Sequence, residues 1–171
     1  AEHIPGKLEQ ALLSLYGSYE KYYRVYEEAK KKNPAVMPPV MIVVCNNMKV
    51  SQLVYEWIAG RENPTSSGQV SIEKGNLEVF RNEDGYALLD KPNTLLIDSE
   101  RLESGESINE QFKKIFENEI EEFRAEYKRR FAGRDDPTDE EILREVMNTV
   151  GKPGRLGENI KCVVSVSMLT E

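Results

Sequence analysis

The stretch "VMIVVCNNMKVSQLVYEWIAG", residues 40–60, decides the fold class. Residues 40–47 form an apolar run that closes with two asparagines, which is typical of a strand buried on both faces of a sheet. Apolar side chains then recur at three- and four-residue steps up to Ile58, and Gly60 provides a helix stop. A strand followed at once by an amphipathic helix is half of a βαβ unit, which favours an α/β fold.

Strand-like and helix-like segments alternate along the rest of the chain. The pattern predicts strands at 40–47, 93–99 and 160–169, a weak edge strand at 77–82, an exposed loop at 61–76, and helices at 7–32, 49–59, 107–132 and 139–150. Capping boxes at Ser107 and Thr138 open the last two helices. The alternation indicates a mostly parallel sheet flanked by helices, with long N-terminal and central helices.

Tyrosines are concentrated in the first expected helix. Its predicted apolar face consists of Leu8, Leu12, Leu15, Tyr19, Tyr22 and Tyr26. Tyrosine rings can stack on nucleic-acid bases, but tyrosines at helical spacing more often belong to a core. We therefore expect this face to pack against the rest of the protein.

The composition describes a soluble globular protein of one domain. The chain has 171 residues, 39% hydrophobic and 31% charged, with a formal net charge of -7. The acidic balance argues against nucleic-acid binding over the whole surface, although it allows a local contact to phosphates. No apolar run approaches the roughly 20 residues of a membrane span, and the N-terminal residues do not have the pattern of a secretory signal.

The few cysteine and histidine residues limit which disulfides, metal sites and catalytic groups the chain can form. Cys45 and Cys162 each lie in an apolar, strand-like run, which favours free buried thiols in a reducing cytoplasm over a disulfide. His3 is the only histidine, so the chain offers almost no side chains for a zinc site or a histidine-based catalytic triad. We expect no catalytic residue, resident cofactor or metal site in this chain.

The glycine-rich stretch "GKPGRLG", residues 151–157, differs from a mononucleotide-binding loop. Such a loop has the form G-x-x-x-x-G-K-[ST], follows a strand and opens a helix. Here the stretch lacks that pattern and leads from a helix into a strand. A helix-to-strand connection is the simpler interpretation, while Lys152, Arg155 and backbone N–H groups leave open a contact to nucleic-acid phosphates.

Acidic residues give two weaker signals. The sequence "DEEIL", residues 139–143, is similar to the acidic box of an ATPase, but no apolar strand precedes it and its carboxylates suit the first turn of a helix. Asp98 ends an apolar strand, which is a common place for a functional carboxylate. A metal-dependent nuclease would also need Glu-x-Lys on a neighbouring strand, whereas residues 126–128 lie inside an expected helix.

The pair Asn46-Asn47 is the strongest candidate that the residues themselves supply. Both follow the first strand and precede the next helix. In open α/β sheets, ligands bind beyond the carboxyl ends of the strands. Side-chain amides at such a place can donate hydrogen bonds to phosphates or base edges, and the helix N-terminus favours the same anions.

Three segments together resemble a known family. They are "PPVMIVVCNNMKVSQLVYEWIAG", "NTLLIDSERLESGE" and "LREVMNTVGKPGRLGENIKCVVSVSMLTE", at 38–60, 93–106 and 143–171. They resemble the restriction subunit of type III restriction–modification enzymes, which are ATP-dependent DNA translocases of helicase superfamily 2 joined to a nuclease domain. The resemblance covers nearly all of residues 7–171, and its last segment is the most specific.

The resemblance implies a partial RecA-like motor lobe. Residues 40–171 would correspond to the second lobe of the family, truncated within helicase motif V, and residues 1–39 to an N-terminal helical segment. In the family, "VSVSMLTE" continues into Gly-Trp-Asp, so the chain is expected to be a fragment. It would contribute DNA-backbone contacts and ATP coupling to the complete endonuclease and would be inactive alone.

The resemblance also implies a nucleic-acid interface. Cys45, Asn46 and Asn47 match the motif IV region, although family members often carry Thr where this chain has Met48. The expected nucleic-acid-binding residues are Asn46, Asn47, Lys152, Arg155 and, at the start of motif V, Ser167, Thr170 and Glu171. ATP and Mg²⁺ would bind the complete protein in the cytoplasm, with DNA and the modification (methyltransferase) subunit as partners and no membrane.

Two alternatives stay open at this point. The first is a free-standing acidic α/β interaction module without catalysis, in which the helix at 107–132 serves as a docking element. The second is a flavodoxin-like binder of a small molecule, which needs a phosphate-binding loop after the first strand. Residues 45–51, "CNNMKVS", contain no glycine, so this second alternative is the weaker one.

Overall fold

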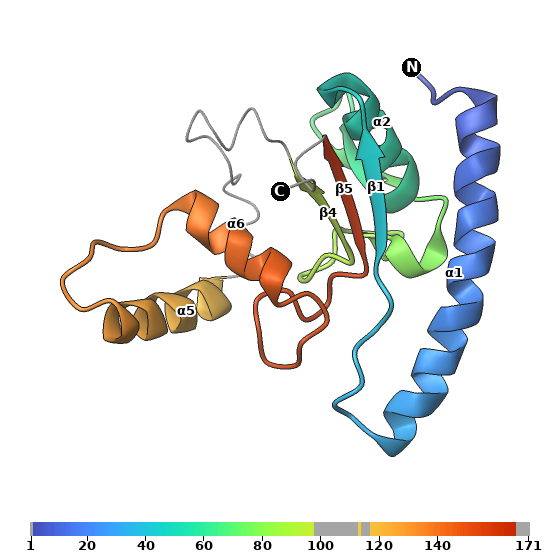
Figure 1. Cartoon of the computed structure of the whole chain (residues 1–171). Coiled ribbons are helices and arrows are strands. Elements are labelled where there is room, and N and C mark those ends of the chain that lie inside the picture. The colour runs from blue at the N-terminus through green and yellow to red at the C-terminus, as the bar shows by residue number, and fades with distance from the viewer. Residues whose placement is uncertain (1, 98–112, 114–116, 167–171) are drawn as a thin grey trace.

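A parallel sheet forms the centre of the structure, a computed structural model that describes residues 2–97, 113 and 117–166 (Figure 1). Its strands, in the spatial order β1-β5-β4, are β1 (Met41–Cys45), β5 (Cys162–Val166) and β4 (Thr94–Ile97). Cys45 lies opposite Val166, and Ile97 lies opposite Ser165, so the carboxyl ends of the strands meet at one edge. The predicted α/β class, with a parallel sheet flanked by helices, is confirmed.

Helices cover both faces of this sheet (Figure 1). On one side lie α1 (Gly6–Lys32) and α2 (Met48–Ala59), and on the other lie α5 (Glu117–Arg130) and α6 (Asp139–Asn148). Successive side chains of a strand point to opposite faces. Cys162 and Val164 therefore pack toward α1 and α2, whereas Val163 packs toward α6.

The predicted apolar face of α1 is partly wrong. Leu12, Tyr16 and Tyr19 are buried, so the tyrosines do contribute to the core. Leu15 and Tyr22, by contrast, are 59% and 70% exposed. The buried face is rotated from the expected one because Tyr16 and Tyr19 pack their rings on Phe80, with ring centres 5.4 and 4.6 Å apart.

Two hydrogen bonds fix α1 to the sheet layer. The Tyr19 hydroxyl donates to the Pro39 carbonyl at 2.8 Å, and the Val79 N–H donates to the Tyr16 hydroxyl at 3.0 Å. The predicted domain boundary between residues 39 and 40 stays a prediction. In the structure, α1 shares one core with the central strand, since Leu12 and Val164 belong to the same cluster.

The strand β1 is not buried on both faces as the apolar run predicted. Ile42 and Val44 are each 54% exposed, because β1 is the edge strand of the sheet. The face that they share with Val163 is covered by α6 mainly over β4 and β5. An apolar run in the sequence indicates a strand, but it does not indicate whether that strand lies at the centre or at the edge of the sheet.

Residues 61–76 form a hairpin instead of the predicted loop. The antiparallel strands β2 (Gly60–Pro64) and β3 (Val70–Lys74) pair along their whole length. Polar contacts join them: the Arg61 guanidinium contacts the Glu73 carboxylate at 2.7 Å, and the Asn63 amide donates to the same carboxylate at 2.9 Å. Hydrophobic periodicity could not predict strands that are held by charged and amide side chains.

The predicted weak strand at 77–82 is also wrong. Glu78–Phe80 is a single 3-10 turn, η1, and both Leu77 and Phe80 are fully buried in the core beneath α1 and α2. The apolar residues of this segment therefore fill the core from a turn, so they do not extend the sheet.

The second helical pair agrees with the predicted caps. Thr138 and Glu141 form the expected capping box at the start of α6. The Tyr127 hydroxyl of α5 donates to the Glu141 carboxylate at 2.6 Å, which links the two helices. The predicted helix at 107–132 is confirmed over residues 117–130, and its start lies outside the described residues except Lys113.

The two cysteines are free and buried, as the sequence predicted. Burial raises the pKa of the Cys45 thiol, and it raises the pKa of Cys162 from 9.0 to about 12. No helix within residues 2–97 and 117–166 has the length and apolar content needed to span a membrane.

We expect neither thiol to react with an aromatic disulfide reagent while the protein is folded. The thiolate is the nucleophile, and a pKa raised to about 12 keeps the Cys162 thiol almost entirely protonated at pH 8. The absorbance of the released thiol should show no rapid reaction at pH 8 in buffer and complete reaction of both cysteines in guanidinium. Fast release of one equivalent from the native protein would contradict this burial.

Candidate nucleic-acid interface

The carboxyl edge of the sheet brings the ends of β1 and β5 side by side. Cys45 and Val166 are opposite each other in the parallel ladder, so Asn46 directly follows one strand end beside the other. Asn46 and Asn47 are both exposed at this edge. The edge therefore presents two side-chain amides to solvent, where α/β folds place their ligands.

Asn47 has a structural role as a helix cap, which the sequence analysis did not predict. Its side-chain oxygen accepts a hydrogen bond from the Val50 N–H at 3.0 Å, which makes it the N-cap of α2. The oxygen is thereby occupied, and only the amide nitrogen is left to donate to a ligand. Asn46 has no such task among the described residues, so it is the better candidate for a contact to phosphate.

The electrostatics of this edge suit an anion. The N-terminus of α2 carries the positive end of the helix dipole, and no acidic residue lies in the first turn. Lys49 lies in that turn and forms an exposed ion pair with Glu2 at 2.9 Å. A phosphate group would meet the N–H groups of α2 beside the amide of Asn46.

Part of the expected interface lies outside the described residues. Ser167, Thr170 and Glu171 belong to this part. Asp98, the separate carboxylate candidate, also lies outside the described residues. Their roles stay predictions. The described part of the edge consists of Asn46, Asn47 and the first turn of α2.

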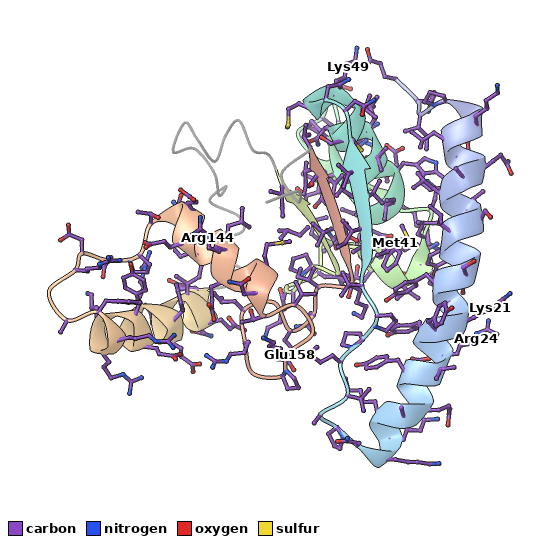
Figure 2. All side chains as sticks on the ribbon, viewed as in Figure 1. Lys21, Arg24, Met41, Lys49, Arg144 and Glu158 are labelled. Carbon is purple, nitrogen blue, oxygen red and sulfur yellow. The ribbon has the colours of Figure 1, made fainter. Side chains whose placement is uncertain are left out.

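The glycine-rich loop lies at the other end of the sheet. Residues 151–157 lead into the amino end of β5, whereas Asn46 follows the carboxyl end of β1. Figure 2 shows Lys49, which follows the asparagines in sequence, above the sheet and Glu158, which follows the loop, below it. The structure therefore does not bring Lys152 and Arg155 together with Asn46 and Asn47.

Contacts within the protein account for much of this loop. The Arg155 guanidinium donates to the Glu126 carboxylate of α5 at 3.0 Å. Lys152 is exposed. The predicted helix-to-strand connection is confirmed. The roles of Lys152 and Arg155 in binding nucleic acid stay predictions, for a part of the surface separate from the asparagine pair.

Comparison with known proteins identifies no relative. No protein-family model, no curated protein and no solved structure matches this chain. The interpretation of the site therefore rests on its geometry and on the resemblance in the sequence.

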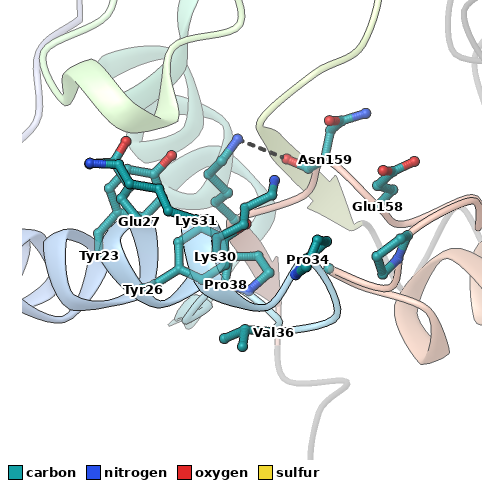
Figure 3. A pocket seen from close by; sticks show the side chains of 13 residues that line it. Tyr23, Tyr26, Glu27, Lys30, Lys31, Pro34, Val36, Pro38, Glu158 and Asn159 are labelled. Carbon is teal, nitrogen blue, oxygen red and sulfur yellow. Dashed lines mark hydrogen bonds between the residues drawn. The ribbon is translucent and has the colours of Figure 1, made fainter.

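The structure also contains a site that the sequence analysis missed. A pocket of about 390 Å³ lies between the C-terminal turns of α1, residues 34–38 and residues 151–161 (Figure 3). Lys161 lines it from the position just before β5. Nothing in the sequence marks this lysine, because a charged residue before a buried strand is ordinarily solvated.

Metal-binding groups give no candidate. Within residues 2–97, 113 and 117–166, no three His, Cys, Asp or Glu side chains gather closely enough to hold a metal ion.

Proposed function

We propose that this chain is part of the ATP-dependent DNA translocase motor of a type III restriction endonuclease. Residues 40–171 would form part of the second RecA-like lobe, and the asparagine pair would contact the DNA backbone. The observation that carries the proposal is the position of Asn46 and Asn47. They lie at the carboxyl end of β1, beside the end of β5 and at the N-terminus of α2.

Three properties of the chain support this proposal. The parallel order β1-β5-β4 is compatible with a partial RecA-like lobe. The segments that resemble the family include both β1 and β5, which meet at the proposed edge. The net charge of -7 suits a lobe that makes few, sequence-independent contacts to the DNA backbone.

The proposal assigns catalysis to the complete protein. ATP and Mg²⁺ would bind between this lobe and a first motor lobe, so this chain alone would hydrolyse no ATP and cut no DNA. The complete enzyme would act in the cytoplasm together with a modification subunit that reads the DNA sequence. Within this chain, the edge would hold the DNA backbone and transmit its position to the ATP site.

Replacing Asn46 with aspartate should weaken DNA binding by about three- to tenfold. The substitution removes an amide donor and adds a negative charge beside the phosphates, and a net hydrogen bond contributes roughly 0.5–1.5 kcal/mol. Fluorescence anisotropy of a short labelled duplex gives the dissociation constant, which should depend only weakly on added salt because few phosphates are contacted.

Asn118→Asp is the matched control. Asn118 is exposed in the first turn of α5, so the variant has the same change of charge away from the edge. The proposal predicts unchanged affinity for this variant. Equal losses in both variants would show a diffuse charge effect instead of a contact at Asn46.

The motor itself is tested in the complete protein. We expect DNA to stimulate its ATPase activity and the Asn46→Asp substitution to reduce that stimulation. A folded complete protein without DNA-stimulated ATPase would contradict the motor, as would a reading frame that encodes no nucleotide-binding lobe.

A further inference from the structure

The pocket at the amino end of the sheet has an unusually placed cation. The Lys161 ammonium donates to the Asn93 side-chain oxygen at 2.6 Å. It donates weakly to the Asn159 carbonyl at 3.4 Å, the hydrogen bond that is dashed in Figure 3. Both acceptors are neutral, and among the described residues no carboxylate lies within ion-pair distance of this lysine. Burial lowers the pKa of Lys161, and the nearby charge of Lys30 lowers it further. Partial burial of an ammonium without a counter-charge costs free energy, and a bound anion would offset that cost.

A second cation borders the same space. Lys30, in the last turn of α1, has its ammonium 5.6 Å from the centre of the Tyr26 ring. Lys31 also lines the pocket, but its ammonium is paired with Glu28 at 2.6 Å. Lys30 and Lys161 therefore bring two positive charges to the pocket, and within the described residues neither has a carboxylate at ion-pair distance.

Two acidic residues, Glu27 and Glu158, also line the pocket. The pKa of Lys30 is raised, first by its contact with the Tyr26 hydroxyl and also by the negative charge of Glu158, so the charge of Lys30 is partly compensated. The Glu158 carboxylate accepts a hydrogen bond from the Gly154 N–H at 3.1 Å, which holds it toward the loop. Glu27 is exposed on α1. The two cations match a phosphate group, since phosphate is a compact anion with several acceptor oxygens.

The remaining walls are aromatic and apolar. The rings of Tyr23 and Tyr26 lie with their centres 5.6 Å apart and, together with Pro34 and Pro38, line one side. Gly151 also lines the pocket and packs against Pro38. A Cβ at this glycine would lie 2.7 Å from the proline ring, so the absent side chain allows the two segments to touch. Tyr23 also stacks on Tyr19, with ring centres 5.8 Å apart, so a flat ligand would contact the part of these rings that is left toward the pocket.

We propose that this pocket binds a small phosphorylated molecule with a planar ring, for which a nucleoside monophosphate is the simplest chemical example. Lys161 and Lys30 hold the phosphate, and Tyr23 and Tyr26 contact the ring. The volume of about 390 Å³ falls in the range of roughly 300–1,000 Å³ that small-molecule sites occupy. The proposal does not rest on the proposed motor, because the pocket and the asparagine pair lie at opposite ends of the sheet.

Calorimetric titration of the full chain with four probes tests the proposal. The probes are adenosine monophosphate, ribose 5-phosphate, inorganic phosphate and adenosine. We expect the monophosphate to bind with a dissociation constant at least tenfold lower than the other three. Lys161→Met should weaken its binding at least tenfold and Lys30→Gln about threefold, since each removes one charged donor.

Lys21→Gln is the matched control. Lys21 is exposed on α1 and does not line the pocket, so this variant has the same loss of charge and should retain full affinity. Lys30 is exposed, so Lys30→Gln tests the site even if Lys161→Met alters folding.

Several outcomes would overturn the proposal. They are the absence of saturable binding by any probe, undiminished binding by Lys30→Gln together with a folded Lys161→Met, and an equal loss in Lys21→Gln. Equal affinity for inorganic phosphate and the monophosphate would overturn the role of the tyrosine rings. Lys161→Met should leave DNA affinity unchanged, so failure here and failure of the proposed motor are distinguishable.

Discussion

Replacing Gly157 with alanine should lower the melting temperature by at least about 6 °C. A Cβ at this position would lie 2.3 Å from the Val146 carbonyl oxygen and 2.6 Å from the Val150 nitrogen, which are both backbone atoms. Overpacking that forces the backbone to shift costs about 1–3 kcal/mol, and a clash with two backbone atoms belongs at the upper end of this range. Each kcal/mol shifts the melting temperature by roughly 2–4 °C in a chain of this size, so about 3 kcal/mol corresponds to about 6–12 °C. Thermal unfolding followed by circular dichroism measures the shift.

Gly154→Ala is the control in the same loop. Gly154 has a φ of +70°, but nothing lies within 4 Å of the position where its Cβ would be. The variant therefore has only the cost of the left-handed backbone, about 1–2 kcal/mol. Gly157 itself has no left-handed φ. A shift in Gly157→Ala no larger than in Gly154→Ala would therefore contradict the close approach to α6 as the reason for glycine at this position.

The expected loss at Gly157 matters because this residue organises both ends of its loop. Its N–H donates to the Thr149 hydroxyl at 3.0 Å, and its carbonyl accepts from the Gly151 N–H at 2.8 Å. The loop is thereby closed on the end of α6, and the chain enters β5 at a defined point.

The sequence predicted those elements whose signals are local. The predicted strand and helix within residues 40–60 are correct because the apolar run, the helical periodicity and the terminal glycine all indicate the structure that this segment adopts. Gly60 indeed ends α2 with a φ of +85°. The capping box at Thr138 was correct for the same reason, since every group involved lies within four positions.

The errors concern properties that depend on distant segments. Phe80 was assigned to a weak strand, yet it is fully buried under Tyr16 and Tyr19, which lie more than sixty positions earlier. Arg61 joins two strands through Glu73, and this cross-strand pair has no signature in hydrophobicity. Only the folded chain shows which apolar face meets which partner.

The same distinction divides the candidate sites. Asn46 and Asn47 were found from sequence because the end of a strand before a helix is a local pattern. Lys161 was not found, since its surroundings in the pocket are formed by Asn93, which is 68 positions away, and by the end of α1. From the sequence alone, functional polar residues can be predicted where they directly follow or precede a helix or strand.

Asn82 is a further residue that only the structure reveals. Its side chain is buried and makes four hydrogen bonds. The amide donates to the Tyr55 hydroxyl at 3.0 Å and to the Thr94 carbonyl at 2.9 Å. The side-chain oxygen accepts from the N–H groups of Asn93 and Thr94 at 2.8 and 2.9 Å. One asparagine therefore satisfies the backbone where β4 begins and connects it to α2.

Replacing Asn82 with alanine should lower the free energy of unfolding by about 3–5 kcal/mol, because four hydrogen bonds of roughly 0.5–1.5 kcal/mol each are lost and buried backbone groups are left unpaired. Urea unfolding measures the change, which is a large part of the 5–15 kcal/mol that holds a typical domain folded. Asn76→Ala is the control, since the exposed Asn76 amide makes a single bond, to the Trp57 carbonyl at 2.9 Å. A loss in Asn82→Ala no larger than in this control would show that water replaces the four bonds, and that packing alone positions the start of β4 beside Lys161 and the pocket.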